Sequence, residues 1–289
     1  LVRGAAAGEG LGNQFLAHIR DCDALALVVR CFADDDVTHV EGRVDPVDDI
    51  DIIDTELMLA DLDSLERRLV NLEKRAKSGD KESVQALRLA GLALAELRVG
   101  RPARAAAVPD DDIKAWKMLQ LLTAKPALYV ANVEEAAAGT GNALSALVAE
   151  RATRDQAKAV AISARIESEI AVLDPAERTE FLEALGLHEA GLGRLIHEAY
   201  ALLGLRTYFT AGPKEARAWT IRAGAKGPEA AGVIHTDFEK GFIRAETIAY
   251  DDYVALGGEA PARDAGRLRS EGRDYVVRDG DVMNFRFNT

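Results

Sequence analysis

An amide and two carboxylates follow directly after an apolar run in the middle of the chain. The run Ala127–Ala131 ends in Asn132, and Glu134 and Glu135 come next. An apolar run of this length between polar residues predicts a short strand buried on both faces, as strands of parallel sheets are. Ligands of open α/β sheets bind at the carboxyl ends of such strands. Asn132 and Glu135 therefore form a candidate site for a planar ring.

The same two side chains also have a structural interpretation, as an amide that caps the next helix and a carboxylate exposed to water. Residues near other predicted strand ends bear on the choice. Ser163 and Ala164 follow the run Ala157–Ile162 and can present backbone N–H groups to the edge of a base. The glycine-rich stretch Leu1–Gly12 can move with bound phosphates. Together these pieces could surround a nucleotide.

The elements that must position these residues alternate between buried strands and helices. Short turns between strand and helix predict a doubly wound parallel sheet. We expect strands at Ala24–Phe32, Ala127–Ala131 and Ala157–Ile162, and helices at Gln14–Asp21, Asn142–Ala152, Ile166–Leu173, Pro175–Leu185 and Gly191–Leu203.

A helical segment interrupts this alternation. Leucines recur at steps of three and four residues in Ile53–Lys77, which predicts one exposed helix. Ser78–Asp80 is the expected turn, and Lys81–Arg98 the returning helix. A further short helix is expected at Asp111–Leu122. The segment is therefore an antiparallel helical insertion between two strands of one sheet.

From Leu205 onward the pattern changes to short alternating runs separated by turns rich in Gly, Asp and Pro. This pattern predicts a small α+β domain of mostly antiparallel strands, with a boundary at Gly204–Leu205. Its strands are expected at Thr207–Phe209, Glu215–Ile221, Gly241–Ala249, Asp274–Val277 and Val282–Phe287.

Composition and charge limit the partners. The 289 residues carry a net charge of −12, which argues against a protein that coats nucleic acid. Residues 205–289 hold 13 Lys and Arg against 13 Asp and Glu, so any RNA contact is expected there. No apolar run approaches the ~20 residues of a membrane span, and no export leader is recognisable. Cys22 and Cys31 are expected to be buried thiols of a cytoplasmic protein.

Taken in order, these pieces resemble a P-loop GTPase-class protein entered partway through, and more narrowly the YchF-type, or Obg-like, ATPases. The resemblance covers the whole chain, including blocks such as GEGLGNQFLAHIRDCDAL, LTAKPALYVANVEE, SARIESEIAVL and DGDVMNFRFN. It implies an incomplete OBG-type nucleotide-binding domain at 1–54 and 123–204. It also implies a helical arm at 55–122 and a TGS domain of β-grasp type at 205–289.

The phosphate-binding motif of that class is absent. No G-x-x-x-x-G-K-[ST] occurs in the 289 residues, and Leu1-Val2 matches the residues that follow the family's D-x-A-G motif. The resemblance therefore implies that the Mg²⁺ and phosphate site belongs to a preceding segment. We expect ATP and Mg²⁺ as cofactors when that segment is present, and an inactive protein without it.

The resemblance assigns the base-binding residues. GTPases of this class usually have N-K-x-D where this chain has Asn132-Val133-Glu134-Glu135. The aspartate of that motif accepts from guanine N1–H and the 2-amino group. With Glu135 there and no lysine, guanine selection is expected to be lost and ATP preferred. Asn132 would bond the purine N7, and Val133 would pack on the ring.

Hydrolysis needs a residue that orients the attacking water. Leu1 stands where Ras-type GTPases have a glutamine, and it has no hydrogen-bonding group. His39 is the candidate within the chain; alternatively it orders the loop after the strand. Arg30 and Arg165 are phosphate partners or, alternatively, surface and packing residues.

In related proteins TGS domains contact RNA or ribosomes, and the C-terminal segment is interpreted in that light. The residues that suit an RNA surface, unless the aromatics are core, are Arg217, Lys226, Lys240, Arg244, Phe238 and Phe242. His235, Asp237 and Glu239 could suggest a metal, but we interpret them as a loop beside a strand.

The sequence thus predicts an ATP-binding, slowly hydrolysing switch that acts with ribosomes or RNA through the TGS domain and arm. Neither membrane association nor DNA specificity is expected. The alternative is an RNA- or protein-binding module in which the nucleotide fold is a scaffold.

Overall fold

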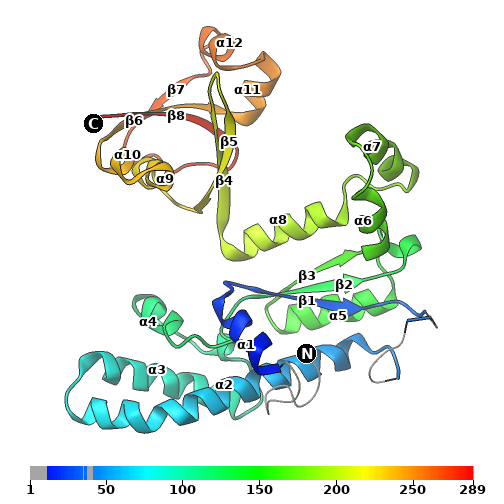
Figure 1. Cartoon of the computed structure of the whole chain (residues 1–289), viewed down its shortest axis with the longest axis vertical. Helices are drawn as coiled ribbons and strands as arrows, with labels where there is room; N and C mark the ends of the chain where they lie inside the picture. Colours follow the sequence, from blue (N-terminus) through cyan, green and yellow to red (C-terminus); the bar gives the residue numbers. More distant parts are fainter. Residues whose placement is uncertain (1–11, 35, 38–41, 289) are drawn as a thin grey trace. The chain divides into compact units, whose positions relative to one another are not determined.

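The computed structural model describes residues 12–34, 36–37 and 42–288. The chain divides into two compact units, Leu1–Leu202 and Leu203–Thr289 (Figure 1). Two candidate residues, Leu1 and His39, lie outside the described residues, as does the glycine-rich stretch before Gly12.

The first unit is built on a parallel sheet. Its strands are β1 (Leu25–Arg30), β2 (Ala127–Asn132) and β3 (Lys158–Ile162), in the order β1-β2-β3. Arg30 lies opposite Asn132, and Asn132 lies opposite Ile162, so the three carboxyl ends form one edge. The expected parallel α/β sheet is therefore confirmed.

Helices cover both faces of this sheet, as Figure 1 shows. Tyr129 and Ala131 pack with α5 (Ala143–Arg154) on one face. Leu128 and Val130 point to the other face, where α8 (Gly191–Leu203) packs. Side chains of a strand alternate between faces, so one short run serves two hydrophobic cores. The remaining helical elements of this part are α1 (Gly12–Asp21), η3 (Glu135–Ala137), α6 (Ala164–Ile170) and α7 (Pro175–Ala184).

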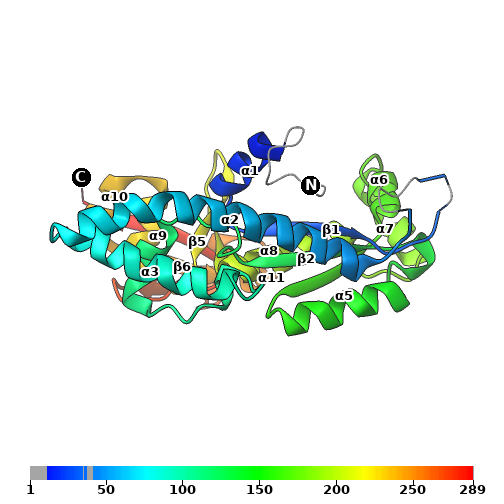
Figure 2. The ribbon, with the colours of Figure 1, turned by 90° about the horizontal axis from the view of Figure 1, so that it is seen from below.

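The arm consists of two helices that run side by side (Figure 2), α2 (Pro46–Lys77) and α3 (Lys81–Leu97). After them come η1 (Ala103–Ala105), η2 (Asp110–Asp112) and α4 (Ile113–Lys117). Apolar side chains from all of these but η2 form one buried cluster, comprising Leu65, Leu89, Ala90, Ala93, Leu94, Leu97, Ala103, Trp116, Leu119 and Leu121.

The first arm helix begins at Pro46, earlier than the expected Ile53. The Asp45 side chain accepts from the Asp48 N–H, and Pro46 occupies the first turn, where its missing N–H costs nothing. Ile50 is fully buried against the sheet. One helix therefore passes from the sheet into the arm without a break.

The expected helix Asp111–Leu122 was wrong beyond its first half, because α4 ends at Lys117. Gln120 takes a left-handed φ of 54°, which stops the helix. The Leu122 and Thr123 N–H groups donate to the Asp61 carboxylate at 2.8 Å each, instead of to helical carbonyls. A side chain distant in the sequence thus competes with the local helix.

The second unit is a mixed five-stranded sheet with helices. The sheet order is β5-β4-β8-β6-β7, with only β4 and β8 parallel. Tyr208, Phe242 and Phe285 form the centre of its core. The elements are β4 (Leu205–Ala211), β5 (Ala216–Arg222), α9 (Gly227–Ile234), α10 (Thr236–Lys240), β6 (Phe242–Ala249), α11 (Tyr250–Leu256), α12 (Glu259–Asp264), β7 (Arg269–Glu271) and β8 (Asp281–Phe287).

Three local expectations fail. Asp274–Val277 is not a strand: it makes one isolated bridge, from Val276 to Lys226, because it pairs with the loop before α9. The strand β7, at Arg269–Glu271, was not predicted. Cys22 is exposed, whereas Cys31 is buried as expected. No helix among the described residues is long and apolar enough to cross a bilayer.

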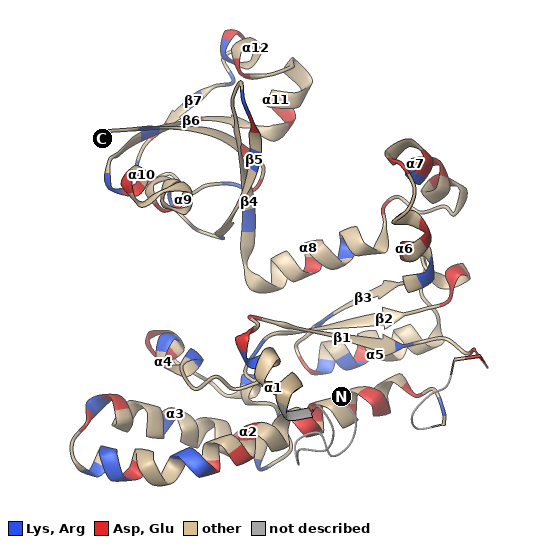
Figure 3. Cartoon of the chain, viewed as in Figure 1, with Lys and Arg blue, Asp and Glu red and all other residues tan. Residues whose placement is uncertain are grey.

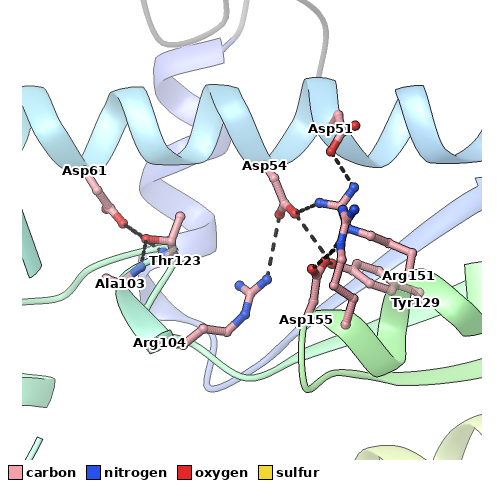
Figure 4. Close-up of polar contacts among 10 residues, drawn as sticks. Asp51, Asp54, Asp61, Ala103, Arg104, Thr123, Tyr129, Arg151 and Asp155 are labelled. Carbon is pink, nitrogen blue, oxygen red and sulfur yellow. Dashed lines mark hydrogen bonds and ion pairs between the residues drawn. The ribbon is translucent and has the colours of Figure 1, made fainter. Parts of the chain in front are cut away.

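Asp61 holds the root of the arm to the segment that leads into β2 (Figure 4). Besides the two backbone N–H groups, its carboxylate accepts from the Thr123 hydroxyl at 2.7 Å. The same hydroxyl accepts from the Ala103 N–H at 3.0 Å. Burial raises the pKa of Asp61, and these hydrogen bonds oppose that rise. One carboxylate therefore satisfies three donors of a buried loop.

We expect Asp61→Ala to destabilise the arm by about 3 kcal/mol, because it leaves buried donors without an acceptor. Trp116 lies in the arm cluster, so its fluorescence in a Trp219→Phe background reports on urea unfolding of the arm. The control is Asp63→Ala, at an exposed carboxylate that pairs with Arg67. Equal midpoints for both variants would contradict the anchoring role.

Candidate functional site

The carboxyl edge of the parallel sheet brings together the predicted base-binding residues from two strands. The Asn132 Oδ1 accepts from the Ala164 N–H at 2.9 Å, which joins the end of β2 to the start of α6. Ala164 is the first residue of α6, whose N-cap Ser163 makes no capping hydrogen bond. Asn132 thus supplies the missing cap from the neighbouring strand. No described residue accepts from the Asn132 Nδ2.

Ser163 lies beside this hydrogen bond and is 2% exposed. Its hydroxyl is buried without a hydrogen-bond partner among the described residues. The Ala164 N–H donates to the Asn132 side chain and is therefore engaged within the protein. The backbone N–H groups of Ser163 and Ala164 were expected at the edge of a base. In the structure the Ala164 N–H instead orients the Asn132 amide.

Glu135 belongs to η3 and forms an ion pair across the same edge. Its carboxylate lies 2.5 Å from the Arg165 Nε, and Arg165 also reaches Glu169 at 3.7 Å. The Glu135 and Arg165 side chains are 45% and 76% exposed, so this pair contributes little to stability and can open. Arg165, which was considered as a phosphate partner, is a partner of Glu135 here.

Val133 differs from its expectation. The side chain is 2% exposed and packs in the core with Tyr129 and Ala131, rather than facing outward to cover a base. The Val133 N–H donates to the Ile162 carbonyl at 2.8 Å, which continues the pairing of β2 with β3 by one residue. This continued pairing directs the side chain inward.

Several known proteins are similar to this chain over its whole length. A curated relative from Haemophilus influenzae, named "Ribosome-binding ATPase YchF", is 54% identical over the whole chain and 79% of its own length. A relative of the same name from Bacillus subtilis is 51% identical with the same coverage. The family model YchF-GTPase_C, described as "Protein of unknown function (DUF933)", matches residues 205–288.

The chain belongs to the YchF family.

Solved structures agree with this membership. The YchF GTPase of Schizosaccharomyces pombe has a TM-score of 0.78 and 32% identity, covering 96% of this chain and 75% of that one. A GTP-binding protein from Pyrococcus horikoshii, at 19% identity and a TM-score of 0.60, shares the fold. The expected resemblance to YchF-type proteins and their fold is therefore confirmed.

Asn142 also belongs to the carboxyl edge of the parallel sheet, although its sequence position indicated only the start of a helix. Its Nδ2 donates to the Cys31 carbonyl at 2.6 Å and to the Glu134 carboxylate at 2.7 Å. Its Oδ1 accepts from the Ser145 N–H in a capping box. Asn142 therefore ties together the ends of β1 and β2. The N-x-x-S spacing before a helix was the available signal.

The arginine at the end of β1 donates to three carbonyls of the loop that follows it. Its Nε, Nη1 and Nη2 donate to the carbonyls of Phe32, Val37 and Asp34 at 3.1, 2.7 and 2.9 Å. Arg30 therefore orders the described part of this loop, with three of its five N–H donors bonded to loop carbonyls. Cys31 beside it is fully buried in the core, and this burial raises the pKa of its thiol to about 12.

His235, Asp237 and Glu239, which were interpreted as a loop beside a strand, belong instead to helix α10 and its N-cap, so that interpretation was wrong. The His235 Nδ1 accepts from the Asp237 N–H at 3.2 Å and caps α10. Within the described residues, no group of three or more His, Cys, Asp or Glu could hold a metal ion.

We expect Asn132→Ala to lower the free energy of unfolding by about 1 kcal/mol, the cost of losing a helix cap. Asn132→Asp keeps an acceptor for the Ala164 N–H and should remain near the parent. Urea unfolding followed by circular dichroism measures both. An equal loss in the two variants would show that the cap from β2 does not stabilise α6.

Proposed function

We propose that this protein is an adenine-nucleotide switch that binds and slowly hydrolyses ATP in the cytoplasm and acts with ribosomes. The names of its relatives support this proposal, since both are called ribosome-binding ATPases at more than 50% identity. The observation in the structure that carries it is the hydrogen bond between Asn132 and Ala164. It holds an amide at the sheet edge where ligands of such folds bind.

The Asn132 amide is oriented to hold a purine. Its Oδ1 is occupied by the Ala164 N–H, so the Nδ2 is the group that can donate to the purine N7. N7 is common to adenine and guanine. Asn132 therefore anchors the ring, and the choice between the bases depends on its neighbours.

Glu135 supports a preference for adenine. Guanine recognition needs a carboxylate that accepts from both N1–H and the 2-amino group. Glu135 has one methylene more than aspartate, and its carboxylate pairs with Arg165. Val133 cannot be exchanged for the lysine of GTPases without burying a charge in the core.

The phosphates and Mg²⁺ would be held by a segment beyond these 289 residues. The relatives are longer, since the chain spans 79% of their length. Among the described residues, no strand lies beside the outer edge of β1. An apolar hollow of about 520 Å³ lies along β1, lined by Leu25, Val29 and Ile53 among others. A further strand there would bury this surface. His39 remains the proposed residue that orients the attacking water. Leu1, at the position of the glutamine of Ras-type GTPases, cannot form the hydrogen bond that this role requires.

We expect the chain joined to its relatives' preceding segment to bind ATP more tightly than GTP. Glu135→Asp should raise GTP affinity relative to ATP about ten-fold, the effect of one charge-assisted hydrogen bond. Glu150→Asp, on the exposed face of α5, is the matched control.

In the same protein His39→Ala should lower kcat about a hundred-fold. Calorimetry and phosphate release measure these effects; tight GTP selectivity in the parent would refute the proposal.

Basic residues in both units support the ribosome contact. The outer end of the arm carries Lys74, Arg75 and Lys77 in the last turn of α2, and Lys81 follows (Figure 3). In the second unit the Arg217 guanidinium lies 4.2 Å from the centre of the Trp219 ring, on the edge strand β5. Such a pair suits stacking on an unpaired base.

The other proposed RNA residues differ in availability. Phe242 is 4% exposed and belongs to the core, so it cannot stack on a base. Lys226 and Arg244 pair with Asp274 and Glu246. Phe238 stacks on Phe287 at 3.9 Å. Arg217 is therefore the residue of this group on which the proposal depends most. Lys240, which also belongs to the expected set, is exposed.

We expect Arg217→Ala to weaken ribosome binding about ten-fold, because one stacking and one phosphate contact are lost. Cosedimentation with ribosomes at two salt concentrations measures the affinity and its salt dependence. Arg263→Ala, at an exposed arginine paired with Glu259, is the control. Ribosome binding without any ATP turnover would favour the scaffold alternative.

A further inference from the structure

Asn142 lies where three elements of the carboxyl edge of the parallel sheet meet. It is the N-cap of α5, and its Nδ2 donates to two oxygens outside that helix. One is the carbonyl of Cys31, directly after β1, and the other belongs to the carboxylate of Glu134, which follows β2. The side chain therefore connects α5 to the ends of two strands.

The cap of α5 uses only half of this amide. The Asn142 Oδ1 accepts from the Ser145 N–H at 2.9 Å, and the Ser145 hydroxyl oxygen accepts from the Asn142 N–H at 2.8 Å. An aspartate would cap the helix as well, because its carboxylate is an acceptor. It has no hydrogen to donate at neutral pH. The Nδ2 bonds can therefore be separated from the cap by a single substitution.

The Nδ2 bonds hold the first of two consecutive carboxylates. Glu134 accepts from Asn142 at 2.7 Å, at the N-terminus of a 12-residue helix, where the helix dipole favours negative charge. Glu135 pairs instead with Arg165 of α6. Glu134 is thus kept at α5, and Glu135 is the carboxylate on the side of α6, the helix that Asn132 caps.

The second acceptor of Nδ2 belongs to the core of the sheet. Cys31 is fully buried, and its N–H donates to the Asn132 carbonyl at 2.8 Å. Asn142 therefore links the Glu134 side chain to a buried part of β1. The Glu134 carbonyl in turn accepts from the Ala137 N–H at 3.0 Å, in the turn η3. A displacement of Glu134 would consequently displace the start of η3.

We propose that Asn142 is a positioning residue of the base site. Its Nδ2 holds Glu134 against α5 and so fixes the segment from Asn132 to Glu135, to which base binding is assigned above. Asn142 acts through Glu134 and does not itself touch the base. The inference rests on the proposed function, because it assumes that a base binds at this edge.

Asn142→Asp tests this role, because it keeps the cap but cannot donate to the Cys31 and Glu134 oxygens. In the chain joined to its relatives' preceding segment, we expect this variant to raise the KM for ATP about five-fold, the effect of one lost hydrogen bond. The kcat should remain that of the parent, because ground-state binding alone is weakened. Phosphate release measures both constants.

Ser145→Ala is the matched control, since it removes the other half of the capping box and leaves the Nδ2 bonds in place. It should keep the parent KM. The double variant Asn142→Asp with Glu134→Gln exchanges donor and acceptor, because the glutamine amide can donate to the aspartate. It should recover most of the parent KM, which a general loss of stability would not allow.

This chain by itself provides a measurement that needs no nucleotide. The Ala137 and Ala138 N–H groups donate to the carbonyls of Glu134 and Glu135 at 3.0 and 3.1 Å. Their hydrogen exchange, followed by NMR, should become at least about three-fold faster in Asn142→Asp, because η3 opens more often. It should not change in Ser145→Ala.

Four results would overturn the inference while leaving the proposed function in place: an unchanged KM in Asn142→Asp, an equal rise in Ser145→Ala, a rise that the double variant does not recover, or unchanged exchange at Ala137 and Ala138. A parent protein that does not bind ATP would instead overturn the proposed function, and this inference with it.

Discussion

The burial of β2 is the constraint from which the arrangement of the first unit follows. This strand pairs on both edges with parallel neighbours and is covered on both faces, so each residue before Asn132 is buried. A strand in that position can carry polar groups only where it ends or where a partner reaches them. Asn132 is the polar group at one end. The Tyr129 hydroxyl is the other, and it donates to Asp155 at 2.8 Å.

The acceptor of the Tyr129 hydroxyl, Asp155, belongs to a network of charged side chains at the root of the arm. Asp155 also binds Arg151, and Arg151 brings in Asp51 and Asp54 from α2. Burial raises the pKa of Asp54, while Arg104 and Arg151 oppose the rise. Asp54 and Asp61 lie two turns apart on the same helix face, yet their surroundings differ. Asp61 satisfies a loop completely, and Asp54 leaves an arginine incomplete. The root of the arm therefore contains both a fully satisfied carboxylate and a buried arginine with unpaired donors.

The continuity of α2 links this root to the sheet edge that carries the candidate site. The helix begins at Pro46, packs Ile50 beside Cys31 in the core of the sheet, and ends at Lys77 on the arm. Sharp kinks in long helices have causes such as an internal proline, and the only proline of α2 lies in its first turn. The root of the arm and the core of the sheet therefore share one continuous helix.

Much of the fold could be predicted from the spacing of hydrophobic residues along the chain. The three buried strands and the crossover helices were predicted within a few residues, because short apolar runs and three-to-four spacing are local signals. The errors occurred where a distant residue intervened. Asp61 took the N–H groups that would have extended α4, and the loop before α9 took the backbone groups of Asp274–Val277. For the candidate site, the sequence indicated Asn132 and Glu135 but not Asn142, Arg165 as the partner of Glu135, or the buried position of Val133.

The sequence by itself determined the family, the parallel sheet and the location of an amide at the end of a buried strand, because these depend on residue types and their spacing along the chain. The tertiary structure alone decided which groups are satisfied. Asn132 meets Ala164, Glu135 meets Arg165, and the Arg104 Nε and Nη2 meet no partner among the described residues. Hydrogen bonds of this kind join positions far apart in the chain and extend over about 3 Å, so they are set only when the elements have packed.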